Sequence, residues 1–421
     1  MSTTIHYTDP VEGFQGWLVY DGHTADLAAG GFRVQPGVTE ELVASLASRM
    51  TLKQRVLGLG VDGAKAGIDY DPAAPGKPAA VRRFLAFLRE ELSERFSMGC
   101  DMGTRWHELE ELAALEDIPS IKYVVKKAQN LTDEDFFGRL RALDDRVGAL
   151  TLGQRRAGHA LAHAALAAAR KQGREPAALT CSLQGFGNMG RAAAYSLLEH
   201  GVRITAVADA HACVVDPRGL DIARMLDTDQ NRAVDSIAPG ALRLPRETLL
   251  DLPADVLILA AGENAITGEQ ARVLPCPVVV VGSNHGLSAA AEQTLADHGV
   301  LVVPDFIGGI GGSASIDALF GPESAPSPGQ VLDSVAAMMD DLLDDLLSRA
   351  RNLGTTPRQA AMDFAAVAVD KRGRRPYGTG PYSQSGLRRA IRTGRATTAP
   401  AATTAPAASA VSVASVPGDG R

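Results

Sequence analysis

Two lysines twelve positions apart, Lys53 and Lys65, stand in surroundings that suggest chemistry. Lys53 closes the run Met50-Thr51-Leu52-Lys53, and Lys65 lies among small residues in Asp62-Gly63-Ala64-Lys65-Ala66-Gly67. Glycines let the backbone or a ligand approach closely, and a pair of ammonium groups can hold a carboxylate. A lysine beside another cation in a desolvated cleft can also act as a base. The pair therefore predicts a site that binds a carboxylate and does acid/base work.

A glycine-rich turn lies further along the chain, at Gly185-Phe186-Gly187-Asn188-Met189-Gly190. It follows an apolar run, and its three glycines would permit the tight turn, the approach of a pyrophosphate and close packing of helix on strand. Asp209, nineteen residues beyond Gly190, would accept hydrogen bonds from the adenosine ribose. Ala210 and His211 offer no cation for a 2′-phosphate, so NAD is predicted rather than NADP. The alternative interpretation of Asp209 is a turn aspartate.

The elements that must position these residues form two domains. Residues 1–150 mix short strands with amphipathic helices, which predicts an α+β domain for substrate binding and oligomerisation. Residues 151–327 begin with an Ala-rich helix over 152–171 and continue as short apolar strands separated by helices, which predicts a parallel sheet covered on both faces. We therefore predict an α/β protein with a Rossmann-type dinucleotide-binding domain and a cleft between the domains. A helix over 328–370 would complete the first domain, and the Ala/Thr/Pro-rich residues 394–421 would form a disordered tail.

Composition narrows the class of protein. The 421 residues are 45% hydrophobic and 22% charged, as in ordinary soluble proteins. A net charge of -7 argues against a nucleic-acid partner, and no apolar run is long enough to span a membrane. The four cysteines lack metal-ligand spacing, so we predict reduced, mostly buried thiols and no metal site. Without a signal peptide the default location is cytoplasmic.

The motifs also resemble those of a known family in their order and spacing. The chain resembles the amino acid dehydrogenases that include the glutamate, leucine, phenylalanine and valine enzymes, and its pattern is closest to the leucine/phenylalanine/valine branch. The resemblance covers roughly residues 10–350. It rests on Gly30-Gly31-Phe32-Arg33, Met50 to Lys53, Gly63 to Gly67, Asp101-Met102-Gly103-Thr104, Gly185 to Gly190, Ala261-Gly262-Glu263-Asn264, Gly282-Ser283-Asn284, Val303-Pro304-Asp305 and Gly311-Gly312.

This resemblance implies a function and a set of site residues. The family oxidatively and reversibly deaminates an L-amino acid to a 2-oxoacid and ammonia, with hydride passing from Cα to the nicotinamide. By position, Lys65 would be the base, Lys53 would hold the α-carboxylate and Asp101 would shuttle protons. Thr151 aligns with a threonine near the active site, although a helix cap is as good an interpretation. A homo-oligomer is implied, as are substrate contacts at Gly30, Gly31, Thr151 and Ile316 and cofactor contacts at Gly185, Phe186, Gly187, Asn188, Met189, Gly190, Asp209, Ala261, Gly262 and Asn284.

Departures from the family pattern bear on the substrate. Ala29 stands where glutamate-specific members have a lysine for the side-chain carboxylate, and Ile316 where they have a serine, which predicts a neutral, apolar substrate side chain. Asp62 replaces a glycine, and its carboxylate could raise the pKa of Lys65 or bind a cationic substrate group. Gly309 replaces an asparagine, and Cys100 is read as a buried spectator. Two alternatives stay open: a relative acting on a non-standard imine or oxo substrate in specialised metabolism, and a nucleotide-binding relative without catalysis.

Overall fold

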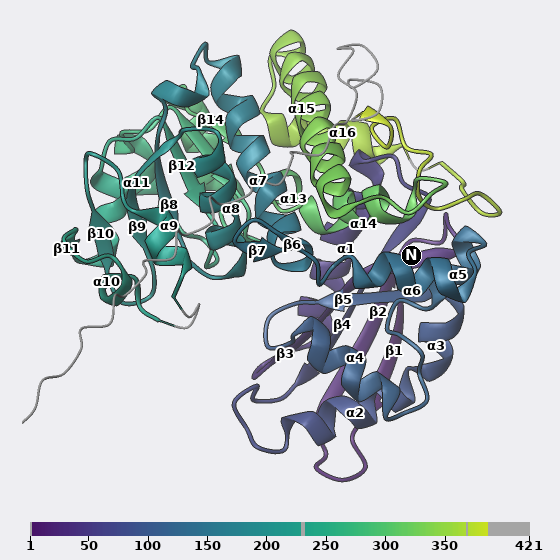
Figure 1. The fold of residues 1–421 in the computed structure, drawn as a ribbon. Helices are drawn as coiled ribbons and strands as arrows, with labels where there is room; N and C mark the ends of the chain where they lie inside the picture. Colours follow the sequence, from purple (N-terminus) through teal and green to yellow (C-terminus); the bar gives the residue numbers. More distant parts are fainter. Residues whose placement is uncertain (1, 229–231, 368, 386–421) are drawn as a thin grey trace, which may run out of the picture.

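The computed structural model describes residues 2–228, 232–367 and 369–385, so the predicted tail over 394–421 lies outside the described residues. Figure 1 shows two lobes, each built around its own sheet and joined by helix α7 (Leu152–Lys171). This two-domain α/β arrangement agrees with the predicted fold class. The limits of the domains at 150 and 327 remain predictions. No helix among the described residues is long and apolar enough to cross a membrane.

The first domain holds a mixed sheet with the strand order β1-β2-β4-β3-β5. Strand β3 is parallel to both of its neighbours, β4 and β5, whereas β1 pairs antiparallel with β2 and β2 with β4. Helix α1 covers one face, and a second apolar cluster on the other face packs against α2 to α4. The elements are β1 (Ser2–Thr8), β2 (Gln15–Asp21), β3 (Leu27–Gln35), α1 (Glu40–Val56), β4 (Val61–Asp69), α2 (Lys77–Phe87), α3 (Arg89–Glu94), β5 (Phe96–Cys100), α4 (Trp106–Ala114), α5 (Val124–Gln129) and α6 (Asp133–Arg141).

Helix α1 lies directly on β4, and this contact explains one of the glycines beside Lys65. A Cβ atom at Gly63 would overlap the backbone of Thr51 and lie 2.5 Å from the carbonyl oxygen of Ala47. Side chains alternate along a strand, so Lys65 projects from the same face as Gly63. Gly63 therefore lets α1 pack closely on β4, and this packing brings Lys53, on α1, toward Lys65.

The second domain holds a seven-stranded sheet ordered β11-β10-β9-β8-β12-β13-β14. The five predicted strands, β9, β8, β12, β13 and β14, are parallel as expected, and two further strands, β10 and β11, extend the sheet antiparallel at one edge. The chain reverses after β9 in a tight turn, where the carboxylate of Asp209 accepts hydrogen bonds from the backbone N–H groups of His211 and Ala212. The strands are β8 (Thr180–Gln184), β9 (Arg203–Ala208), β10 (Cys213–Val215), β11 (Leu242–Leu244), β12 (Val256–Leu259), β13 (Val278–Val281) and β14 (Leu301–Val303).

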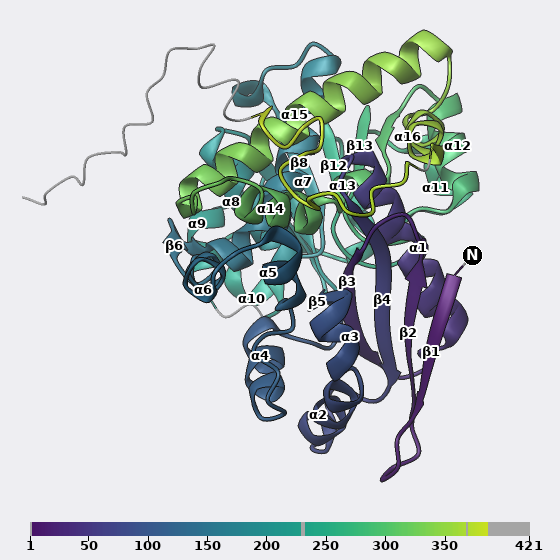
Figure 2. The same ribbon diagram turned by 90° about the vertical axis from the view of Figure 1, so that its right-hand side faces the viewer.

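Helices flank this sheet and return to the first domain. The predicted helix over 328–370 is two helices, because Gly354 has a left-handed φ of 63° and a proline follows at 357. The first of them, α15, packs on α7 and α14, and α16 packs on α1 (Figure 2). The remaining elements include β6 (Arg146–Val147), β7 (Leu150–Thr151), α8 (Asn188–Glu199), α9 (Ile222–Leu226), α10 (Val234–Ile237), α11 (Gly268–Val273), α12 (Ala289–Asp297), α13 (Asp305–Gly308), α14 (Gly311–Phe320), α15 (Pro328–Leu353) and α16 (Pro357–Ala366).

Candidate active site

Lys65 and Asp101 meet across strand β3 of the first sheet. The Nζ atom of Lys65, on β4, lies 2.5 Å from Oδ2 of Asp101, which directly follows β5. Between them runs β3, where a Cβ atom at Gly31 would lie 3.0 Å from the Lys65 ammonium and 3.1 Å from Cβ of Asp101. Only a glycine at this position leaves the two groups free to touch.

Arg33 is a second partner of the same carboxylate. Its Nε donates to Oδ2 of Asp101 at 3.0 Å, and the guanidinium is almost fully buried. Burial disfavours the charged form of Asp101, but the Lys65 and Arg33 charges outweigh it and hold the pKa of Asp101 well below its usual range. Our sequence analysis included Arg33 in a motif without giving it a role. The signal was available, because Arg33 lies two residues after Gly31 and so on the same face of β3.

Lys53 reaches the cleft from α1 and contacts the second domain. Its Nζ donates to Oδ1 of Asn284 at 3.2 Å, and Asn284 lies in the loop after β13. Burial lowers the pKa of Lys53 to about 8, an effect that Asp305 opposes and the nearby Lys65 charge reinforces. The two lysines of the sequence motif therefore lie close enough for their charges to interact, while their separate roles stay predictions.

A buried ion pair fixes the loop that carries Asn284. The carboxylate of Asp305 lies 2.8 Å from Arg358 and 3.6 Å from Arg49, and it accepts the backbone N–H of His285 at 3.1 Å. Burial opposes ionisation of Asp305, but the two arginines still hold its pKa below the usual value. Asp305 thus connects the loop to Arg358 on α16 and to Arg49 on α1. These contacts hold Asn284, next to His285 in the loop, beside Lys53.

The glycine turn has the geometry that a pyrophosphate needs. Gly185 has a φ of 91°, a Cβ atom at Gly187 would meet no atom within 4 Å, and one at Gly190 would overlap the carbonyl oxygen of Gly185. Helix α8 starts at Asn188 without a side-chain cap, so its first N–H groups face open space. A cleft of about 840 Å³ is lined by Asp101 from one domain and by Gly187 and Asn188 from the other.

Comparison with known proteins agrees with this geometry. The family model of the Glutamate/Leucine/Phenylalanine/Valine dehydrogenases matches residues 150–375, and that of the Glu/Leu/Phe/Val dehydrogenase dimerisation domain matches residues 2–114. The chain belongs to this family. The resemblance inferred from the motifs is therefore confirmed, and the protein is an amino acid dehydrogenase.

Individual relatives of the enzyme are glutamate dehydrogenases. That of Thermotoga maritima is 27% identical over 383 residues, which cover 86% of this chain and 87% of that protein. The NAD-specific glutamate dehydrogenase A of Halobacterium salinarum is 29% identical over 307 residues, covering 72% and 67%. The solved hetero-hexameric glutamate dehydrogenase from Thermus thermophilus, in its Leu-bound form, is 28% identical with a TM-score of 0.69, covering 87% of this chain and 86% of that one. Placement in the leucine/phenylalanine/valine branch stays a prediction.

Several predicted contact residues have structural duties in this enzyme. The carboxylate of Asp209 accepts hydrogen bonds from three backbone N–H groups, those of His211, Ala212 and Val234. Asp209 therefore stabilises the turn after β9, which was the alternative interpretation of this residue. Thr151 caps α7 and accepts the N–H of Gln154 at 3.2 Å. Their contacts with ribose and substrate remain predictions, as do those of Gly30, Phe186, Met189, Ala261 and Gly262.

The structure bears differently on Asp62, Gly309 and Cys100. Asp62 points away from Lys65, because residues three apart on a strand face opposite sides, and it accepts hydrogen bonds from Thr24 N, Thr24 Oγ1 and Ala25 N at 2.7 to 3.1 Å. A Cβ atom at Gly309 would lie 2.6 Å from the carbonyl oxygen of Gly282 and 3.3 Å from Nζ of Lys53, so this departure lies beside Lys53 and its effect on the substrate stays a prediction. Cys100 is exposed rather than buried, whereas the other three free cysteines are buried as predicted.

Two cations near the site were missed from the sequence. Lys122 donates from Nζ to the carbonyl oxygen of Met98 at 2.9 Å. Arg156, on α7, donates to Oγ of Ser315 at 2.9 Å and to the carbonyl oxygen of Gly312 at 3.3 Å. Among the residues that the structure describes, neither cation has a carboxylate within 4.0 Å. No sequence signal distinguished them from other basic residues, since their partners lie far along the chain.

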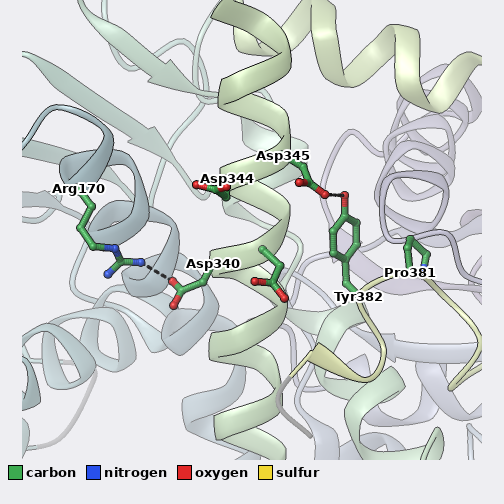
Figure 3. A pocket seen from close by; sticks show the side chains of 7 residues that line it. Arg170, Asp340, Asp344, Asp345, Pro381 and Tyr382 are labelled. Atoms are coloured by element: carbon green, nitrogen blue, oxygen red, sulfur yellow. Dashed lines mark hydrogen bonds and ion pairs between the residues drawn. The ribbon is translucent and has the colours of Figure 1, made fainter. Parts of the chain in front are cut away.

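An acidic hollow of about 460 Å³ lies at the opposite end of α7, beside α15 (Figure 3). Arg170 binds Asp340 at 2.6 Å, and the hydroxyl of Tyr382 donates to Asp345 at 3.1 Å. Arg170 is fourteen residues from Arg156, which is about 21 Å along a helix. The hollow is thus separate from the cleft, and its carboxylates are engaged within the fold.

Proposed function

We propose that this enzyme catalyses the reversible, NAD-dependent oxidative deamination of an L-amino acid. The observation that carries the proposal is the ion pair between Lys65 and Asp101, because Asp101 also lines the cleft that reaches the glycine turn and the Lys53 charge acts on both groups. This arrangement provides a cation for a carboxylate and a proton relay within one small volume.

Lys53 binds the substrate α-carboxylate. Its pKa of about 8 leaves the ammonium charged at neutral pH, and an incoming carboxylate further favours the charged form. Asn284 accepts one of its protons and so orients the ammonium.

Lys65 acts as the base, and Asp101 carries protons to and from the substrate amine. The low pKa of Asp101 depends on two cations, Lys65 and Arg33. When Lys65 is neutral, one of these charges is absent. Lys65 can then take a proton from the water that attacks the iminium carbon, and Asp101 can accept a proton from the substrate amine. Arg33 keeps its hydrogen bond to the carboxylate throughout and holds it in place.

The cofactor is held by the turn over 185–190, by Asp209, Ala261 and Gly262, and by Asn284 at the nicotinamide end. When bound, it accepts the hydride from Cα of the substrate. The open space at Gly187 and the uncapped start of α8 fit its pyrophosphate. NAD is favoured because no arginine or lysine follows Asp209 directly and because a related enzyme is NAD-specific.

A neutral, apolar side chain next to the substrate α-carbon is supported by Ala29 and Ile316, which are both buried and uncharged. Assembly into a homo-oligomer is supported by the match of residues 2–114 to a dimerisation domain. The alternative of a non-standard imine or oxo substrate loses one of its two reasons, because Asp62 is bound to Thr24 on the side away from Lys65, and it keeps the other, Gly309 beside Lys53.

The test is a spectrophotometric screen of NAD and NADP reduction with the twenty amino acids at alkaline pH. We expect turnover with NAD, lowered about 10³-fold by Lys65→Ala because a general base is lost. Lys127→Ala is the matched control, since Lys127 is an exposed lysine on α5. Undiminished turnover in Lys65→Ala, or reduction of NADP alone, contradicts the proposal.

A further inference from the structure

Exposed apolar side chains gather where α15 ends and α16 packs against it. Leu353, Met362 and Phe364 are between 40% and 53% exposed and belong to these two helices. Leu353 and Phe364, together with the buried Leu346, line a hollow of about 540 Å³, here called the apolar hollow. A cluster of exposed apolar side chains around a hollow is a candidate surface for binding another segment.

The apolar hollow adjoins the acidic hollow. Asp345 and Tyr382 line both, and the hydroxyl of Tyr382 donates to Asp345 (Figure 3). The acidic hollow is lined by four aspartates of α15, at positions 340, 341, 344 and 345. Arg170 and Lys171 on α7 pair with two of them, so these six side chains carry an excess of two negative charges. The two hollows together fit a segment that has both apolar and cationic side chains.

The chain has such a segment directly after the described residues. Residues 386–395, here called the basic segment, contain the apolar residues Leu387 and Ile391 and no acidic residue. The described chain ends at Ser385, three residues after Tyr382, so the basic segment begins beside both hollows. Its four cations are Arg388, Arg389, Arg392 and Arg395.

The length of the basic segment matches the two hollows. Residues 386–395 can span at most about 35 Å when extended. Asp340 and Leu353 mark the far ends of the two hollows on α15, and their separation in the sequence corresponds to about 20 Å along a helix. The segment can therefore reach across both. The matches to the family models end at residues 114 and 375, so Tyr382 and the basic segment lie outside the part of the chain that defines the family.

We propose that the basic segment of each chain binds to its own α15 and α16. Leu387 and Ile391 lie in the apolar hollow, and the arginines lie at the aspartates of the acidic hollow. Arg349 lines the apolar hollow and repels arginines there, which favours this orientation. Because α16 packs on α1, the helix that carries Lys53, the bound segment stabilises the helices that support this side of the site.

The test is hydroxyl-radical footprinting of the full chain, in which mass spectrometry measures how fast each side chain is oxidised. The rate rises with the exposure of the side chain to solvent. Leu387→Ser together with Ile391→Ser should raise the oxidation rates of Leu353 and Phe364 about threefold or more, because the apolar side chains that cover them no longer bind. Equal rates in the wild type and in this double variant overturn the inference.

Two further double variants test the charges and the position of the segment. Arg388→Glu together with Arg389→Glu should raise the same two rates, since like charges then meet at the acidic hollow. Val411→Ser together with Val413→Ser, outside the basic segment, is the matched control and should leave them unchanged. The reference side chain is Val273, which is 75% exposed at the end of α11 and should oxidise at one rate throughout. A rise in the control variant, or one that Val273 shares, contradicts the proposal.

Disulfide trapping identifies which chain supplies the bound segment. Phe364→Cys together with Ile391→Cys should form a disulfide within one chain under a mild oxidant, and this product runs as a monomer on a non-reducing denaturing gel. Ile391→Cys alone is the control, and peptide mapping should find no disulfide between it and the exposed Cys100. A disulfide-linked dimer assigns the segment to a neighbouring subunit, and failure to form either product means that the segment is not bound. Each of these two results overturns the proposal.

Discussion

Two groups of cations near the first sheet differ in how their charge is compensated. In the first group, here called the Lys65 cluster, Lys65 and Arg33 both bind the carboxylate of Asp101. In the second group, Lys122 and Arg156 donate only to neutral oxygen acceptors among the described residues. A proton relay needs its counter-charge permanently in place. The contrast therefore marks the Lys65 cluster as the group suited to proton transfer.

The largest expected effect is on kcat, and it follows from removing the carboxylate of the first group so that its cations, like those of the second group, have none. Asp101→Asn removes the carboxylate and leaves Lys65 and Arg33 uncompensated. We expect kcat to fall about 10²-fold through loss of the proton relay. We also expect sulfate to inhibit the variant more strongly than the wild type, because Lys65 and Arg33 then lack their carboxylate and attract an anion. Steady-state kinetics over a series of sulfate concentrations measure both effects. An unchanged kcat would contradict the role of the Asp101 carboxylate in the proton relay.

A smaller expected effect is a fall in carboxylate affinity with rising pH, caused by the titration of Lys53. Its ammonium is charged below a pKa of about 8 and neutral above it, so affinity for a carboxylate is full at low pH and declines as pH rises. The inhibition constant of valerate, which has no other titrating group in this range, should rise about tenfold per pH unit well above 8. Lys53→Gln should bind valerate weakly at every pH. A constant that stays flat to pH 10 in the wild type contradicts the assignment of Lys53.

The smallest effect on substrate preference concerns Asp62, a buried carboxylate that belongs to neither group. Asp62→Ala leaves the N–H groups of Thr24 and Ala25 without their hydrogen-bond acceptor. This should lower the free energy of unfolding by about 2 kcal/mol. The ratio of kcat/KM for different amino acids should change less than about threefold. Denaturant unfolding and the amino acid screen measure the two quantities. A changed preference with unchanged stability would mean that Asp62 does act on the substrate.

Features that depend on neighbouring residues in the chain could be predicted from the sequence. The helix over 152–171 and the glycine turn depend on neighbouring residues, and both are observed where they were expected. Lys65 and Asp101 were found through motifs, although their contact needs three adjacent strands. Arg156 was missed because its partners Gly312 and Ser315 lie 156 and 159 positions away. The concern over Asp62 was an error of a different kind, since strand alternation already places it opposite Lys65.

The central claim is that Lys65 and Asp101 act together as one proton relay, and a double-mutant cycle tests it most directly. We predict that the variant carrying both Lys65→Ala and Asp101→Asn loses about as much kcat as Lys65→Ala alone, because groups that act as a unit have non-additive effects. A double variant whose loss equals the product of the two single losses would contradict the account.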